Sequence, residues 1–128
     1  MKTKLLLLAF VAATVLFAGR TYAHHSFAAT YFVDQTVTVK GTVMEFLFRN
    51  PHSFLKVQAP DDKGEMQLWA IEWAGGAQLA QANVAKDTLK PGDVVVVSGN
   101  PGRNPAEHRI RLKSISRTDG FKWEGVIQ

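Results

Sequence analysis

The stretch VTVKGTVMEFLF, residues 37–48, decides the fold of this chain, because its apolar residues recur with a period of two. The residues that would share one face of a strand are Val37, Val39, Val43 and Leu47. Gly41 falls on the same face, where a glycine is typical of the bend or bulge that curls a strand into a small barrel. We therefore expect a curved β-strand here.

The remaining elements follow from the same periodicity and from turn residues. Further strands are expected at residues 52–58, 65–73, 94–99 and 107–116, with one short alanine-rich helix at residues 75–85. Three strands, a helix and two strands form the element order of an OB-type barrel. The sequence therefore predicts a mainly all-β fold, a five-stranded OB-type barrel with its helix between strands 3 and 4. A small open sheet or sandwich with one helix is the alternative.

The first 23 residues have the pattern of a secretory signal peptide. Two lysines precede an apolar run of about 15 residues, which is shorter than the roughly 20 that cross a bilayer as a helix. Small residues at Thr21 and Ala23 predict cleavage before His24. We expect a periplasmic or secreted protein, with an uncleaved N-terminal anchor as the alternative.

The mature chain is expected to hold one domain. We place an N-terminal arm at residues 24–35, the barrel at residues 36–118 and a C-terminal tail at residues 119–128. The leader carries three of the fifteen basic residues and no acidic one, so twelve basic residues face eleven acidic ones in the mature chain. This balance argues against a nucleic-acid partner, which needs a strongly positive face. The absence of cysteine excludes disulfides and thiolate metal sites.

Histidines near the predicted cleavage site suggest a metal site. Cleavage after Ala23 would leave His24 with a free α-amine beside its imidazole, and nitrogen donors of this kind suit copper. His52 follows a proline-fixed turn and is the candidate second imidazole, while His25 would bind or orient. The predicted metal ligands are therefore His24, His25 and His52, with copper as the candidate cofactor. Solvated surface histidines are the alternative interpretation.

Aromatic and basic side chains on the predicted strands suggest a different kind of site. Phe46 and Phe48, together with two tryptophans, would form a platform for oligonucleotides or sugars, although packing in the core is the more ordinary role. Arg109, Arg111 and Lys113 form a positive stripe, which is also typical of a solvated strand face. The candidate ligand-binding residues are Asn50, Trp69, Glu72, Trp73, Arg109 and Arg111.

Glu72 is the carboxylate of greatest interest. It falls on the strand face that carries Leu68, and if buried it needs a partner such as Arg49, Lys56 or a histidine. The sequence shows no paired acids of clear geometry, no Ser-His-Asp order and no glycine-rich phosphate loop. We therefore do not expect an enzyme.

Five short motifs run along the mature chain. They are Ala-His-His-Ser-Phe at residues 23–27, Gly-Thr-Val at 41–43, Asn-Pro-His at 50–52, Trp-x-x-Glu at 69–72 and Leu-Lys-Pro-Gly-Asp at 89–93. With these motifs the chain resembles a family of small secreted bacterial proteins of unknown function. It departs from that pattern at residues 73–76, where Trp-Ala-Gly-Gly replaces a Gly-Ser-Pro-like turn. The resemblance implies secretion and a barrel, and it implies no established activity.

The leading functional hypothesis is a small exported binding protein for copper or another transition metal. The alternative is a metal-free periplasmic module that binds an anionic or sugar-like ligand or a protein partner. A metal-dependent oxidative enzyme that uses the same N-terminal site is a third interpretation. We expect no nucleic-acid partner and no membrane attachment once the leader is removed.

Overall fold

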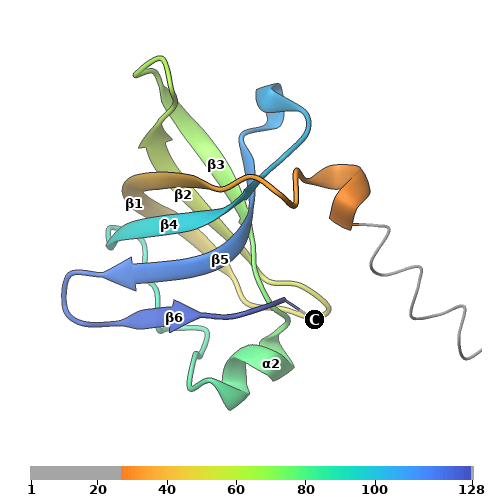
Figure 1. Cartoon of the computed structure of the whole chain (residues 1–128). Coiled ribbons are helices and arrows are strands. Elements are labelled where there is room, and N and C mark those ends of the chain that lie inside the picture. The colour runs from red at the N-terminus through yellow and green to blue at the C-terminus, as the bar shows by residue number, and fades with distance from the viewer. Residues whose placement is uncertain (1–26, 128) are drawn as a thin grey trace, which may run out of the picture. The chain divides into compact units, whose positions relative to one another are not determined.

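The computed structural model describes residues 27–127, and its main compact unit begins at Tyr31. Residues 27–30 form one helical turn. The elements that follow are β1 (Val37–Leu47), β2 (Phe54–Pro60), β3 (Met66–Glu72), α2 (Gly76–Gln81), β4 (Val94–Pro101), the 3-10 helix η1 (Pro105–Glu107), β5 (Arg109–Arg117) and β6 (Lys122–Glu124) (Figure 1). No helix within this described part of the chain is long and apolar enough to cross a membrane.

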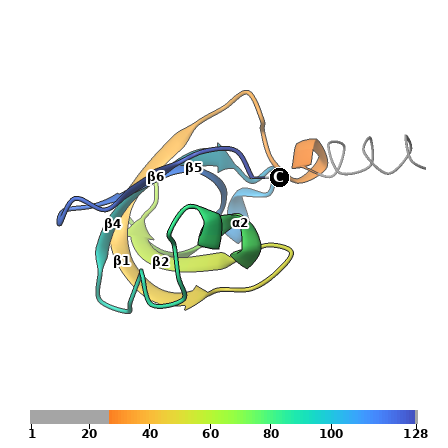
Figure 2. The same ribbon diagram turned by 90° about the horizontal axis from the view of Figure 1, so that it is seen from below.

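The strands form one closed sheet. Their order is β3-β2-β1-β4-β5-β6, and β3 also pairs in parallel with β5, which closes strands β1 to β5 into a barrel. The other neighbouring strands are antiparallel. The predicted all-β barrel with a short helix between strands 3 and 4 is therefore confirmed. Seen along the barrel, α2 lies across one end, which we call the closed end (Figure 2).

The register of β1 shifts between Val43 and Glu45, where the strand contains an irregularity. Phe46 then pairs with the fully buried Leu55, so its side chain points to the inner face. The prediction that Leu47 shares the inner face with Val43 is wrong, because a bulge reverses the alternation of the residues that follow it.

Gly41 does not lie at the register shift of β1; it lies where the backbone of β1 comes very close to the backbone of β2. A Cβ on Gly41 would overlap the carbonyl oxygen of Gln58 on β2. Only a residue without a side chain allows the two strands to approach so closely, and such close approach is typical of the strongly curved sheet of a small barrel.

Aromatic rings fill the closed end. Trp73 is fully buried, and its ring centroid lies 5.6 Å from that of Phe46 and 5.3 Å from that of Trp123. Phe46 in turn meets Phe48 edge to face at 5.9 Å. Large rings in such contact contribute strongly to small cores.

The turn after β1 holds α2 in place. The backbone N–H of Gly76 donates to the carbonyl oxygen of Arg49 at 2.9 Å, and the N–H of Ala77 donates to Oδ1 of Asn50 at 3.2 Å. The Asn50–Pro51 peptide bond is cis. The Asn-Pro-His motif therefore lies at a structural junction between the first strand and the helix.

A sixth strand lies within the segment predicted to be a tail. β6 pairs with β5 in antiparallel fashion, with Trp123 opposite Ile115. Three residues are too few to show a period of two, so the sequence carries no pattern for this strand. Its tryptophan reaches the core beside Trp73.

The N-terminal arm is fixed along the end of β4. Phe32 N–H donates to the carbonyl oxygen of Pro101 at 2.9 Å, and Tyr31 forms an isolated β-bridge with Gly102. The side chain of Asn100, which is only 4% exposed, donates to the carbonyl oxygens of Val33 and Gln35. These bonds hold residues 31–35 against the barrel.

Candidate functional site

Glu72, the last residue of β3, is buried although it lies on the outward face of its strand. Leu68, four residues earlier on that face, is 54% exposed, whereas Glu72 is 7% exposed. The difference comes from the arm, because the fully buried Tyr31 bonds to the Glu72 carboxylate. Burying a carboxylate requires such compensation.

Three side chains surround the Glu72 carboxylate. The Tyr31 hydroxyl donates to Oε2, and Arg109 Nη2 lies 3.4 Å from the same oxygen. His52 Nδ1 lies 2.7 Å from Oε1. Both carboxylate oxygens are therefore engaged, and we call the residues Tyr31, His52, Glu72 and Arg109 the Glu72 cluster.

The structure selects one of the partners predicted for Glu72. A histidine, His52, occupies that position. Lys56 instead pairs with Glu45 at 2.9 Å, and the Arg49 guanidinium lies 5.2 Å from the centre of the Phe54 ring. Arg109 and Tyr31 are additional partners that sequence reasoning missed, because they come from β5 and from the arm.

Burial raises the pKa of the Tyr31 hydroxyl above its ordinary value of 10.0, and the hydrogen bond to Glu72 and the charge of that carboxylate add to the effect. The phenol therefore remains a protonated donor at neutral pH. Arg109 also faces the Tyr31 ring, with its guanidinium carbon 5.6 Å from the ring centre. Tyr31 thus adds a charge-assisted hydrogen bond and a cation–π contact to the backbone bonds that attach the arm to the barrel.

The contact with Glu72 sets the chemistry of His52. Because a carboxylate can only accept, the N–H of the neutral ring lies on Nδ1 and donates to Glu72, which places the ring lone pair on Nε2. Histidines that bind metals commonly donate their other ring N–H to a carboxylate in this way. The His52 side chain is 25% exposed and lies at the rim of the barrel rather than within the core.

The other two predicted metal ligands, His24 and His25, lie outside the described residues. Between residues 27 and 127, histidine, aspartate and glutamate form no group of three or more that could hold a metal ion.

The candidate ligand-binding residues do not gather on one face. Trp73 is fully buried in the core, and the Asn50 side chain accepts the N–H of Ala77 at the start of α2. Arg111 donates to the carbonyl oxygen of Ile127 at 3.1 Å, and burial lowers the pKa of its guanidinium. Arg109 belongs to the Glu72 cluster. Trp69 and Arg109 line a pocket between two loops, whereas Asn50 lines a separate hollow beside α2.

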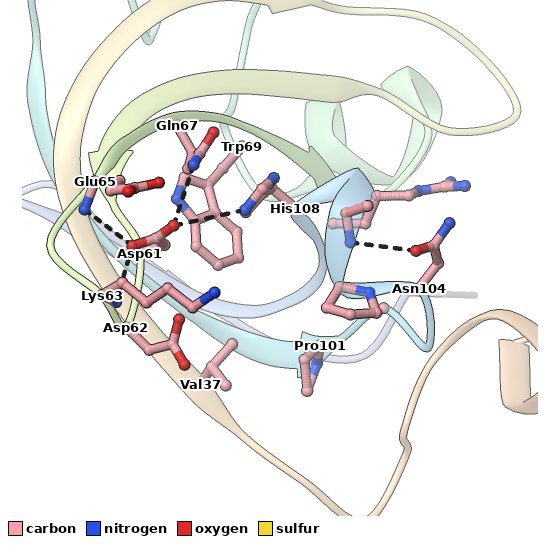
Figure 3. A pocket seen from close by; sticks show the side chains of 14 residues that line it. Val37, Asp61, Asp62, Lys63, Glu65, Gln67, Trp69, Pro101, Asn104 and His108 are labelled. Carbon is pink, nitrogen blue, oxygen red and sulfur yellow. Dashed lines mark hydrogen bonds and ion pairs between the residues drawn. The ribbon is translucent and has the colours of Figure 1, made fainter.

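That pocket lies at the end of the barrel opposite α2, which we call the open end (Figure 3). It has a volume of about 530 Å³ and lies between the β2–β3 turn and the connection from β4 to β5. Its lining includes Asp61, Lys63, Gln67, Trp69, Asn104, Pro105, His108 and Arg109. Sequence reasoning missed most of these residues, because turn composition predicts a loop without revealing what it faces.

Asp61 organises one side of the pocket. Its Oδ1 accepts the backbone N–H groups of Lys63 and Glu65, each at 2.9 Å, and its Oδ2 accepts from Gln67 Nε2 at 3.1 Å. Desolvation opposes ionisation, but the hydrogen bonds from Gln67, Glu65 and Lys63 prevail and lower the pKa of Asp61. His108 Nε2 lies 4.0 Å from Oδ2 (Figure 3). The carboxylate is therefore a charged anchor of the turn.

Comparison with known proteins identifies one family. The model of DUF6152, a family of unknown function, matches residues 12–111. A search of curated proteins finds no match. The family match covers the arm, strands β1 to β4 and the start of β5, so it includes every member of the Glu72 cluster.

Proposed function

We propose that this chain, which belongs to DUF6152, a family of unknown function, is a small exported protein that binds copper or another transition metal ion. The proposed ligands are the α-amine and imidazole of His24 and the imidazole of His52, with His25 binding or orienting beside them. The proposal does not include turnover of a substrate.

The observation that carries this proposal is the 2.7 Å contact between His52 Nδ1 and the Glu72 carboxylate. The contact orients the ring and places its N–H on Nδ1, as a carboxylate behind a metal-binding histidine does. Glu72 is itself restrained by Tyr31 and Arg109. Such a supported side chain suits a ligand that must keep a defined direction.

The chain length is compatible with the participation of His24. Seven positions separate His24 from Tyr31, so the intervening chain spans at most about 25 Å. Tyr31 bonds to Glu72, the same carboxylate that holds His52. In the proposed site His24 would reach His52 over this length of chain.

Export is part of the proposal, because the α-amine of His24 exists only after cleavage behind Ala23. The chain has no cysteine, so a thiolate site does not compete for copper. The mature N-terminus, measured by intact mass of the exported protein, is expected to be His24. A different N-terminus would contradict the proposed ligand set.

The binding test is a Cu(II) titration of the correctly processed protein, followed by competition with a chelator and by electron paramagnetic resonance. His52→Ala is expected to weaken Cu(II) binding and to remove one nitrogen from the spectrum. Glu72→Gln is expected to weaken binding about 10- to 100-fold, as loss of the carboxylate behind a ligating histidine does. Circular dichroism checks that each variant is folded.

His108→Ala is the matched control, because His108 is also a partly exposed histidine near a carboxylate but lies in the open-end pocket. Its Cu(II) affinity should equal that of the wild type. A second control carries one extra alanine before His24, which removes the histidine from the N-terminus and should weaken binding. Equal affinity in the wild type, His52→Ala and the extended protein would overturn the proposal.

A further inference from the structure

We propose that the open-end pocket binds a neutral, hydroxyl-rich ring such as a sugar unit. This inference goes beyond the metal proposal and uses different residues, apart from the shared Arg109. Its basis is the combination of an aromatic wall, fixed polar side chains and balanced charge in a pocket at the mouth of a barrel, where ligands commonly bind.

The size and position of the pocket suit a small ligand. Its volume of about 530 Å³ falls within the usual range for small-molecule sites, which runs from about 300 to 1,000 Å³. Two connections border it, the turn between β2 and β3 and the segment that contains η1. The pocket therefore lies between two loops of one barrel, and a ligand there would contact both.

Trp69 supplies the aromatic wall. Its Nε1 donates to the carbonyl oxygen of Ala59 at 3.2 Å, and its ring meets the His108 ring edge to face at 5.2 Å. These contacts hold the indole in one orientation. A fixed indole offers apolar surface to the C–H groups of a sugar ring at little cost in side-chain entropy.

The polar side chains of the pocket are held in place before any ligand binds. Gln67 donates to Asp61, and Asn104 accepts the N–H of Ala106 while donating to Glu107 at 3.2 Å. Figure 3 shows Gln67 and His108 on either side of Trp69, with Asn104 across the pocket. Amide and imidazole groups act as donors and acceptors, so together they match hydroxyl groups.

The charges favour a neutral ligand over an anion. Asp61, Asp62 and Glu65 oppose Lys63 and Arg109 in the lining. Arg109 also lies 3.4 Å from Glu72 and 3.6 Å from Glu107, so acidic neighbours already offset its charge. The pocket has no surplus of positive charge that would attract a phosphate or an acidic sugar.

A metal cation is also disfavoured in this pocket. Asp61 accepts three N–H groups, and His108 is close to its second oxygen. A cation would have to displace these donors, since the same lone pairs would be needed for coordination. The remaining acids lie on the exposed turn.

The test is a titration of the ¹⁵N-labelled protein with neutral monosaccharides and disaccharides, with inorganic phosphate and glucuronic acid as anionic probes. Saturable shifts are expected for residues 61–69 and 102–109 and for the Trp69 indole N–H with at least one neutral sugar. The anions should bind more weakly. No saturable shift with any neutral sugar, or tighter binding of the anions, would overturn the proposal.

Two variants locate the site. Trp69→Ala is expected to weaken sugar binding about tenfold or more, because it removes the aromatic wall. Gln67→Ala is a milder variant that should weaken binding several-fold, whereas Gln58→Ala is its matched control on the exposed part of β2 and should bind as the wild type does. Equal affinity in Trp69→Ala, Gln67→Ala and Gln58→Ala would overturn the assignment of the pocket.

Discussion

The two ends of the barrel differ in what occupies them. At the closed end α2 lies across the strands, and the rings of Phe46, Trp73 and Trp123 fill the interior. At the open end apolar surface and charged or polar side chains together line a pocket of about 530 Å³ beside Trp69. Trp73 belongs to the core at the closed end, and Trp69 forms a wall of the pocket at the open end, although the two lie only four residues apart in the sequence.

The difference shows that one predicted strand face can hold residues with two roles. Trp69 and Trp73 fall on the same face of the strand predicted at residues 65–73, so residue type and alternation cannot distinguish them. What distinguishes them is the neighbouring segment, because β6 and α2 cover one end and two loops border the other. Stability is therefore expected to depend on the closed end, and ligand contact on the open end.

Replacement of the two tryptophans tests this comparison most strongly. Trp73→Ala should lower the free energy of unfolding by about 3–5 kcal/mol, because it leaves a cavity among aromatic rings. Trp69→Ala is the matched variant at the open end and should cost about 1–2 kcal/mol, since its side chain is only partly buried. Urea unfolding followed by circular dichroism measures both values. Equal losses would contradict the division of roles.

Tyr31→Phe tests the arm that covers Glu72. Loss of a hydrogen bond to a buried carboxylate should lower the free energy of unfolding by about 1.5–3 kcal/mol at neutral pH. Thr38→Val also removes a hydroxyl, but from an exposed bond to Ser98, and should cost less than about 1 kcal/mol. A cost for Tyr31→Phe no larger than that for Thr38→Val would show that the arm does not depend on this bond.

The pKa of Tyr31 adds a pH dependence to the same comparison. Because the pKa is raised in the folded state, the stability from the neutral phenol is complete below pH 10.0, the ordinary pKa, and falls as the pH rises above it. The unfolded chain loses that proton first, which favours unfolding. The alkaline loss of stability should therefore be smaller in Tyr31→Phe than in the wild type, as measured by urea unfolding across this pH range.

Replacement of a glycine at each end is expected to give the smallest difference in stability between the two ends. A Cβ on Gly75, at the closed end, would overlap the carbonyl oxygen of Pro51, so Gly75→Ala should cost about 1–3 kcal/mol. A Cβ on Gly102, at the open end, would lie 3.1 Å from the Cβ of Arg109, and Gly102→Ala should cost less than about 1 kcal/mol. Thermal unfolding of both variants checks the order, and a larger loss for Gly102→Ala would reverse it.

Much of the fold could be predicted from the alternation of apolar residues, because strand periodicity is a local property. The element order that leads to a barrel is visible in residues 37–116, and it is confirmed. The glycine at position 41 indicated a bend or bulge in β1, but the register shift lies further along, between Val43 and Glu45. The three-residue β6 could not be predicted, since it is too short to show an alternation.

The candidate site divides in the same way. The sequence identifies His52 as a candidate metal ligand and Glu72 as a carboxylate that needs a partner if buried, and it includes a histidine among the possible partners. It does not reveal that Tyr31 buries Glu72, because the arm and the strand are 41 positions apart. Nor does it reveal Asp61 and His108 as neighbours, since each lies in a separate loop.

The sequence by itself determined the order of strands β1 to β5 along the chain and the position of the helix, because both depend on residue type and near spacing. Only the tertiary structure decided which end of the barrel closes, which tryptophan is core and which carboxylate is buried. The physical reason is that burial is a property of what lies across from a side chain, and barrel closure through β3 and β5 brings together segments that are distant in the chain.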